Sequence, residues 1–196
     1  MKNPDRKAMK RRAQEAAKNG SDTLLIYNSN NGSTLQYAKW IVNATDCDVM
    51  PYSRSKLGYV VAYQNIIFCG WIRAMEITRL RLLRQNASNF NIEGKNFIIC
   101  GVGIMDPTEE YRKKLIDYNS LDVFDDSNIF LLPGRYDPKK ANVKGKGVMK
   151  AMGNTMFDLM NDEETELLKY RFEHGYDGMD INAITPIVEK ILASRK

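Results

Sequence analysis

Residues 23–32 read TLLIYNSNNG, an apolar run that ends in small polar residues and a glycine. Three further strong apolar runs follow, at residues 65–70 (NIIFCG), 95–102 (KNFIICGV) and 128–132 (NIFLL), and a weaker one covers residues 47–52. Runs with little polar alternation are typical of strands that are buried on both faces of a parallel sheet. We therefore predict five strands.

Segments with helical spacing separate the predicted strands. Apolar residues recur at helical intervals over residues 33–43 and 77–85, and a third helix is predicted over residues 107–118. Capping residues at 161–164 and a proline in the pair 185–186 predict two more helix starts. The alternation of strands and helices predicts an α/β protein with a doubly wound sheet. Five strands fit a flavodoxin-like parallel sheet of order 2-1-3-4-5 with helices on both faces.

The 196 residues, 43% of them hydrophobic, suit one domain. Residues 1–20 carry seven basic and two acidic side chains, which equals the net charge of +5, so residues 21–196 are neutral. We predict a basic N-terminal extension over 1–20 and a single domain over 21–196. Such an extension would attract nucleic acid or anionic lipid. We favour a solvated, partly helical tail and do not expect a nucleic-acid partner.

Composition excludes several classes of protein. No stretch approaches the ~18–20 apolar residues of a membrane-spanning helix, and the charged N-terminus lacks the apolar core of a secretion signal. Three widely spaced cysteines predict neither a disulfide framework nor a zinc site, so a reducing, cytoplasmic location is expected. His174 is the single histidine, which argues against a metal site. Cys69 and Cys100 end two predicted strands, and buried, inert thiols are expected there.

In a doubly wound sheet, ligands bind beyond the carboxyl ends of the strands. That rule selects the loops at residues 28–34, 70–76, 101–107 and 133–137. The first loop combines small hydroxyl and amide side chains with a glycine at a helix start, which favours a phosphate held by backbone N–H groups. It has neither a Gly-Lys-Ser/Thr sequence nor a GxGxxG pattern. An ordinary turn, with Ser33 or Asn31 as the helix cap, is the alternative.

Four segments in the same order resemble flavoproteins. Residues 29–34 (SNNGST) are similar to the Thr/Ser-x-x-Gly-x-Thr phosphate loop of flavodoxins. Residues 66–73 (IIFCGWIR) resemble the third strand and Ile-Arg flavin loop of the flavodoxin-domain group that contains menaquinone-dependent protoporphyrinogen oxidase. Residues 134–136 (GRY) and 147–152 (GVMKAM) resemble that group's later segments, and the similarity covers 22–195. The group continues Arg-Tyr-Gly where this chain reads Arg-Ala-Met-Glu at 73–76.

The resemblance implies non-covalently bound FMN. Trp71 would stack on the isoalloxazine, Arg73 would place positive charge beside it, and the Gly70–Trp71 peptide would present a carbonyl to the reduced ring. The implied phosphate site consists of Ser29, Asn30, Asn31, Gly32, Ser33 and Thr34; the ring would lie between Gly70, Trp71, Ile72 and Arg73 on one side and Gly101, Val102, Gly103, Ile104 and Met105 on the other.

The function that follows is electron transfer or flavin-dependent oxidoreduction, with a redox protein or a quinone as partner. A dehydrogenase similar to menaquinone-dependent protoporphyrinogen oxidase is one alternative, and a cofactor-free binding module recruited by the basic tail is another. No acid or base is evident, so no catalytic side chain is assigned. Methionines at helical spacing over residues 149–160 predict a core-facing helix, or else an amphipathic segment that contacts a membrane and admits a quinone.

Overall fold

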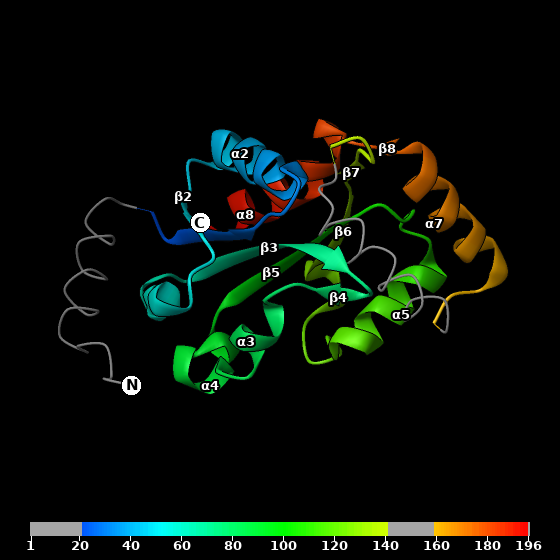
Figure 1. Ribbon diagram of the computed structural model, residues 1–196. Coiled ribbons are helices and arrows are strands. Elements are labelled where there is room, and N and C mark those ends of the chain that lie inside the picture. Colours follow the sequence, from blue (N-terminus) through cyan, green and yellow to red (C-terminus); the bar gives the residue numbers. More distant parts are fainter. Residues whose placement is uncertain (1–20, 141–158, 196) are drawn as a thin grey trace.

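A mostly parallel sheet forms the centre of the computed structural model, which describes residues 21–140 and 159–195 (Figure 1). Its strands follow the order β2-β1-β3-β5-β6, and the short β4 pairs with β3 in the antiparallel direction. The chain is therefore an α/β protein. The strands are β1 (Thr23–Asn28), β2 (Asp48–Pro51), β3 (Asn65–Arg73), β4 (Glu76–Ile77), β5 (Asn96–Gly103) and β6 (Ile129–Pro133).

The central strands β1, β3 and β5 have long apolar runs because both faces of the sheet are covered there. In β1, Leu24 and Ile26 belong to one hydrophobic cluster, whereas Leu25 between them belongs to a second cluster on the opposite face. Leu25 pairs in register with Ile67, which pairs with Ile98, and all three are fully buried. Successive residues of a strand point to opposite faces, so a doubly covered sheet needs apolar residues at every position.

One face of the sheet, here called the α2 face, is covered by α2 (Ser33–Thr45) and α8 (Thr185–Ser194) (Figure 1). Tyr37 and Ile41 of α2 pack there with Ile187 and Ile191 of α8, and all four side chains are fully buried. The proline at the start of α8 suits the first turn, where its missing N–H has no partner to lose.

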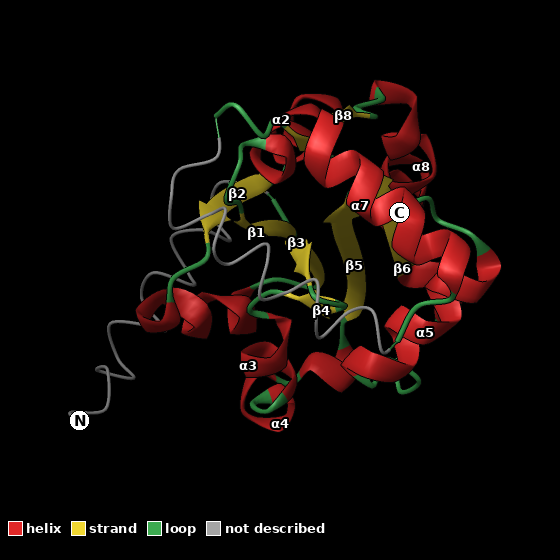
Figure 2. Cartoon of the chain, turned by 45° about the vertical axis from the view of Figure 1, so that its right-hand side comes forward, coloured by secondary structure: helices red, strands yellow, loops and turns green. Residues whose placement is uncertain are grey.

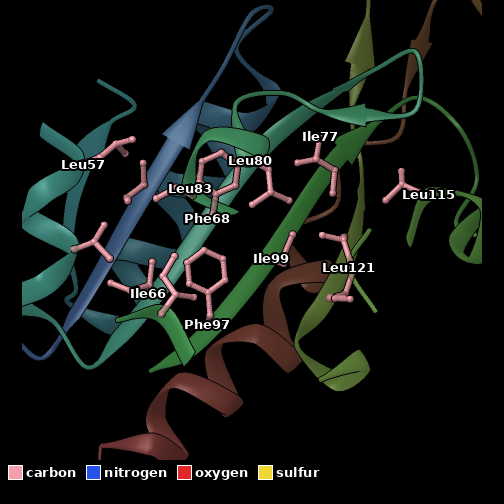
Figure 3. Close-up of a cluster of buried hydrophobic side chains, with 14 of the residues drawn as sticks. Leu57, Ile66, Phe68, Ile77, Leu80, Leu83, Phe97, Ile99, Leu115 and Leu121 are labelled. Carbon is pink, nitrogen blue, oxygen red and sulfur yellow. The ribbon is translucent and has the colours of Figure 1, made fainter. Parts of the chain in front are cut away.

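The opposite face, here called the α5 face, is covered by several shorter elements; Figure 2 shows α3, α4 and α5 on the side of the strands opposite α2. Leucines of these elements pack on Ile66, Phe68 and Ile99 of the central strands (Figure 3). The covering elements are η1 (Arg54–Ala62), α3 (Leu80–Arg84), α4 (Ala87–Phe90), η2 (Ile92–Gly94) and α5 (Glu109–Asn119).

The remaining elements lie outside the central sheet. α7 (Asp162–His174) begins with a capping box, in which the Asn161 side chain accepts from the Glu164 amide while the Glu164 carboxylate accepts from the Asn161 amide. β7 (Arg135–Tyr136) and β8 (Tyr176–Asp177) form a separate antiparallel pair. Two short helical turns, η3 (Asp126–Asn128) and η4 (Ile181–Ile184), complete the described residues.

Most predicted elements are confirmed, and the strands differ from prediction by one to three residues at their ends. The helix predicted over 77–85 is wrong in its first part, because Ile77 lies in β4 and the helix covers only Leu80–Arg84. The predicted five-stranded sheet also gains β4 as a sixth strand. The N-terminal extension and most of the methionine segment lie outside the described residues. Within residues 21–140 and 159–195, no helix is both long enough and apolar enough to span a bilayer.

Candidate functional site

The carboxyl edge of the sheet brings two of the predicted segments together. The Asn28 side chain, at the end of β1, donates a 2.8 Å hydrogen bond to the Thr78 hydroxyl, which donates a 2.8 Å bond to the Trp71 carbonyl. The Thr78 amide donates to the same carbonyl at 3.0 Å. The loop after β1 and the end of β3 are therefore held beside each other.

The N-terminus of α2 has neither a capping side chain nor an acidic residue in its first turn. Gly32 occupies the cap position in the left-handed region (φ 91°), which glycine adopts at little cost, and no side chain caps the helix. The first turn also contains no acidic residue. By contrast, Thr108 caps α5 and two glutamates lie in its first turn. The alternative in which Ser33 or Asn31 caps α2 is therefore wrong.

Next to this helix start lies a buried hydroxyl with no partner. The Ser29 Oγ atom is inaccessible to solvent and forms no hydrogen bond with the described residues. A buried unsatisfied hydroxyl costs roughly 1–3 kcal/mol, so such groups are usually paired with protein, water or a ligand. Asn30 and Asn31 are exposed beside it, and their side chains are joined by a 3.2 Å hydrogen bond.

Ser33 and Thr34 are both buried at the start of α2. The Ser33 hydroxyl accepts a 3.0 Å hydrogen bond from the Arg135 amide in β7. That contact joins residues 134–136 to the loop at residues 28–34. The Ser33 hydroxyl therefore also has a structural role. Arg135 itself lies 3.5 Å from Asp177 in an exposed ion pair.

The predicted flavin loop at 70–73 is part of a strand. Gly70 to Arg73 continue β3, and the chain turns only at Ala74 and Met75, before β4. A Cβ atom on Gly70 would lie 2.7 Å from the Ile77 side chain, so this glycine is required for the hairpin to pack. The Gly70–Trp71 peptide is therefore held in a paired strand.

The turn of this hairpin is strained and is held from α5. Ala74 (φ 45°) and Met75 (φ 66°) both have positive φ, a conformation that costs non-glycine residues about 1 kcal/mol or more each. The buried Asn119 side chain donates 2.7 Å to the Met75 carbonyl and accepts 2.8 Å from the Ile77 amide. Met75 is itself fully buried, so packing and hydrogen bonds hold a turn in which a glycine would carry no strain.

Trp71 and Ile72 point to opposite faces of the sheet. Strand alternation places Trp71 on the same face as Cys69, which is the α2 face. Its indole is half-buried and, among the described residues, belongs to neither hydrophobic cluster. Ile72 instead packs on the α5 face, where its side chain lies over Gly101 and Gly103. Arg73, at the end of β3, is exposed.

The predicted site segment at residues 101–105 is only partly accessible. Gly101, Val102 and Met105 are buried, and whether they flank a ring stays a prediction. Gly103 and Ile104 remain half-buried. A Cβ atom on Gly101 or Gly103 would lie within 3.2 Å of the Ile72 side chain, so Ile72 covers both glycines.

Arg171 of α7 fixes this segment. Its guanidinium donates to the Ile104 carbonyl, binds both carboxylate oxygens of Asp106 at 2.8 and 3.0 Å, and lies 4.0 Å from the centre of the Tyr176 ring. Neither Arg171 nor Asn119 was identified from the sequence. No local signal marks them, because their partners lie dozens of residues away along the chain.

The predicted burial of Cys69 and Cys100 is confirmed. Cys69 pairs in register with Cys100, both thiols are fully buried and free, and the hydrogen bond to Cys100 together with burial raises the pKa of Cys69. His174 is exposed and stacks on Tyr170. In the described parts of the chain, no group of His, Cys, Asp or Glu residues could hold a metal ion.

Comparison with models of protein families finds no match. Comparison with curated proteins finds no significant relative.

Together these contacts define a polar site at the carboxyl edge, on the α2 face. The uncapped helix start supplies backbone donors, the Ser29 hydroxyl lies beside them, and Trp71 provides an aromatic surface on the same face. Such a set of groups can bind a phosphate and a flat ring, and it contains no acid–base pair.

Proposed function

We propose that the chain is a flavodoxin-like protein that binds FMN and transfers electrons. The observation that carries the proposal is the uncapped start of α2 beside the unpartnered, buried Ser29 hydroxyl. A phosphate there would receive backbone hydrogen bonds and would benefit from the positive end of the helix dipole.

The strand order supports the proposal. The parallel strands lie in the order β2-β1-β3-β5-β6, which is compatible with the flavodoxin-like order 2-1-3-4-5 if the antiparallel β4 is an addition to that fold. In that order the carboxyl ends of the first and third parallel strands form the switch point where ligands bind. Asn28 and Trp71, which the Thr78 bridge connects, lie at that point.

Each group of the chain would have a distinct part in binding. The first-turn amides of α2, with Ser29 and Thr34, would hold the phosphate, and Trp71 would stack on the ring. Arg73 would supply positive charge near the ring, and the Gly103–Ile104 backbone would limit its far side. When bound, FMN supplies one- and two-electron chemistry; the partner would be a redox protein or a quinone.

A visible spectrum and a titration test the proposal. Purified protein should show flavin absorption bands and release FMN on denaturation. Flavin-free protein should quench FMN fluorescence with a 1:1 end point, and riboflavin, which lacks the phosphate, should bind more weakly. Protein that is colourless and leaves FMN fluorescence unchanged would refute the proposal.

A further inference from the structure

Positive charge is concentrated in one part of the folded domain. Residues 48–86 carry six basic and two acidic side chains, although residues 21–196 are neutral as a whole. Among the described residues, none of the six basic side chains forms an ion pair with a carboxylate. The six are Arg54, Lys56, Arg73, Arg79, Arg81 and Arg84.

Tyr52 lies within this basic region, at the carboxyl edge of the sheet. It directly follows β2, and its amide donates a 2.7 Å hydrogen bond to the Tyr27 carbonyl in β1. Its ring packs against the core of the α5 face. Its hydroxyl oxygen is inaccessible to solvent and has no hydrogen-bond partner among the described residues.

Two arginines belong to the surroundings of Tyr52, one over its ring and one close to it in sequence. The Arg79 guanidinium carbon lies 5.9 Å from the centre of the Tyr52 ring, and Arg54 is only two residues further along the chain. Burial raises the pKa of Tyr52, while the charges of Arg79 and Arg54 act in the opposite direction. Arg79 also has an unfavourable left-handed backbone (φ 74°).

We propose that Tyr52, Arg54 and Arg79 form a binding site for the carboxylate or phosphate group of a ligand. Guanidinium groups suit such oxyanions because their N–H donors match two oxygens at once. The Tyr52 hydroxyl would donate a further hydrogen bond and would thereby gain the partner that it lacks.

This oxyanion site is separate from the phosphate site proposed at α2. Tyr52 packs on the α5 face, whereas α2 lies on the opposite face. Both sites lie at the carboxyl edge, since Arg79 follows Thr78, whose hydroxyl is bound by Asn28 at the end of β1. The inference does not depend on FMN.

Nuclear magnetic resonance of the ¹⁵N-labelled full chain tests the site, with inorganic phosphate and succinate as probes at constant ionic strength. Saturable shifts are expected for the amides of residues 52–55 and of Arg79. Arg54→Gln and Arg79→Gln should weaken binding about tenfold or more, and Tyr52→Phe by about threefold to tenfold. Arg81→Gln removes an equal charge from a neighbouring exposed arginine and should change affinity less than twofold.

The relative affinity of the two probes identifies the ligand's group: tighter binding of succinate indicates a carboxylate, and tighter binding of phosphate indicates a phosphorylated compound. Three results would overturn the site: shifts that do not saturate, equal losses in Arg81→Gln and Arg79→Gln, or phosphate shifts that vanish when FMN is bound. If Gly32→Val lost phosphate binding while Arg79→Gln kept it, the anion would bind at α2, and this result would also overturn the site.

Discussion

Asn119 donates a 2.7 Å hydrogen bond from its side chain to the Met75 carbonyl, across 44 residues of sequence. The same side chain accepts from the Ile77 amide and donates to the Leu115 carbonyl. One buried amide thus joins α5 to the turn between β3 and β4. Since β3 carries Trp71 and Arg73, this contact also determines where the proposed ring-binding residues lie.

Asn119→Ala should lower the free energy of unfolding by about 2–3 kcal/mol, because it leaves the Ile77 amide and the Met75 carbonyl buried without partners. Urea unfolding measures the change. Asn43→Ala, at an exposed position in α2, is the matched control and should change stability by less than about 0.5 kcal/mol. Equal effects of the two substitutions would contradict the role of Asn119.

Ala74→Gly should stabilise the protein by about 0.5–1 kcal/mol, because glycine adopts the positive φ of residue 74 without steric cost. The same substitution at Ala44, an exposed residue within α2, should instead destabilise by about 0.5–1 kcal/mol. Thermal or urea unfolding of the two variants compares them. A loss of stability in both would show that the turn is not strained.

Ser29→Ala should have opposite effects on stability and on ligand binding. The flavin-free protein should be as stable as the wild type or slightly more stable, because a buried hydroxyl without a partner is removed. FMN binding should weaken by about 1–2 kcal/mol through one lost phosphate hydrogen bond. Ser88→Ala, on the exposed surface of α4, should change neither quantity. Unchanged FMN affinity in Ser29→Ala would place the phosphate elsewhere.

The protein should lose stability as the pH rises above about 10. Burial, and then the nearby Asp48 carboxylate, raise the pKa of Tyr63, whose hydroxyl donates 2.9 Å to Asp48. The native state therefore keeps this proton where the unfolded chain, with a tyrosine pKa of about 10, releases it. A tyrosine that keeps its proton in this way lowers the free energy of unfolding by up to about 1.4 kcal/mol for each pH unit above 10.

Urea unfolding between pH 8 and pH 11.5 measures this loss. Tyr63→Phe should reduce its slope, and Tyr118→Phe, which removes an exposed hydroxyl, is the control. Stability that stays constant to pH 11.5 in the wild type would contradict the expected linkage.

The three cysteines should be unreactive in the native protein. All three are buried, and burial raises the pKa of Cys47, so little thiolate is available for reaction. A thiol reagent should modify none of them before unfolding and all three in denaturant without reductant. Fewer than three reactive thiols after unfolding would indicate a disulfide and would contradict the expectation of three free cysteines.

The strands were predictable because their burial is a local property of the sequence. A strand covered on both faces must be apolar at consecutive positions, as in residues 23–27, and this pattern needs no knowledge of the partners. The starts of α5 and α7 were also predictable, since Thr108 and Asn161 cap helices through atoms only three residues away.

Local sequence patterns did not predict the hairpin formed by β3 and β4. Ile77, Leu80 and Leu83 recur every three residues, which resembles a helix face, but Ile77 pairs with Ile72 in β4 and its amide binds Asn119. Periodicity cannot distinguish these cases, because either arrangement buries the same three side chains.

The sequence alone therefore determined the α/β class, the parallel strands and the polar, lysine-free loop at the start of α2. Only the tertiary structure decided that Gly70 to Arg73 form a strand, that Ile72 covers Gly101 and Gly103, and that Asn119 and Arg171 hold the edge of the sheet together. The reason is physical: burial and capping depend on neighbours in sequence, whereas these contacts join segments that the chain brings together only when it folds.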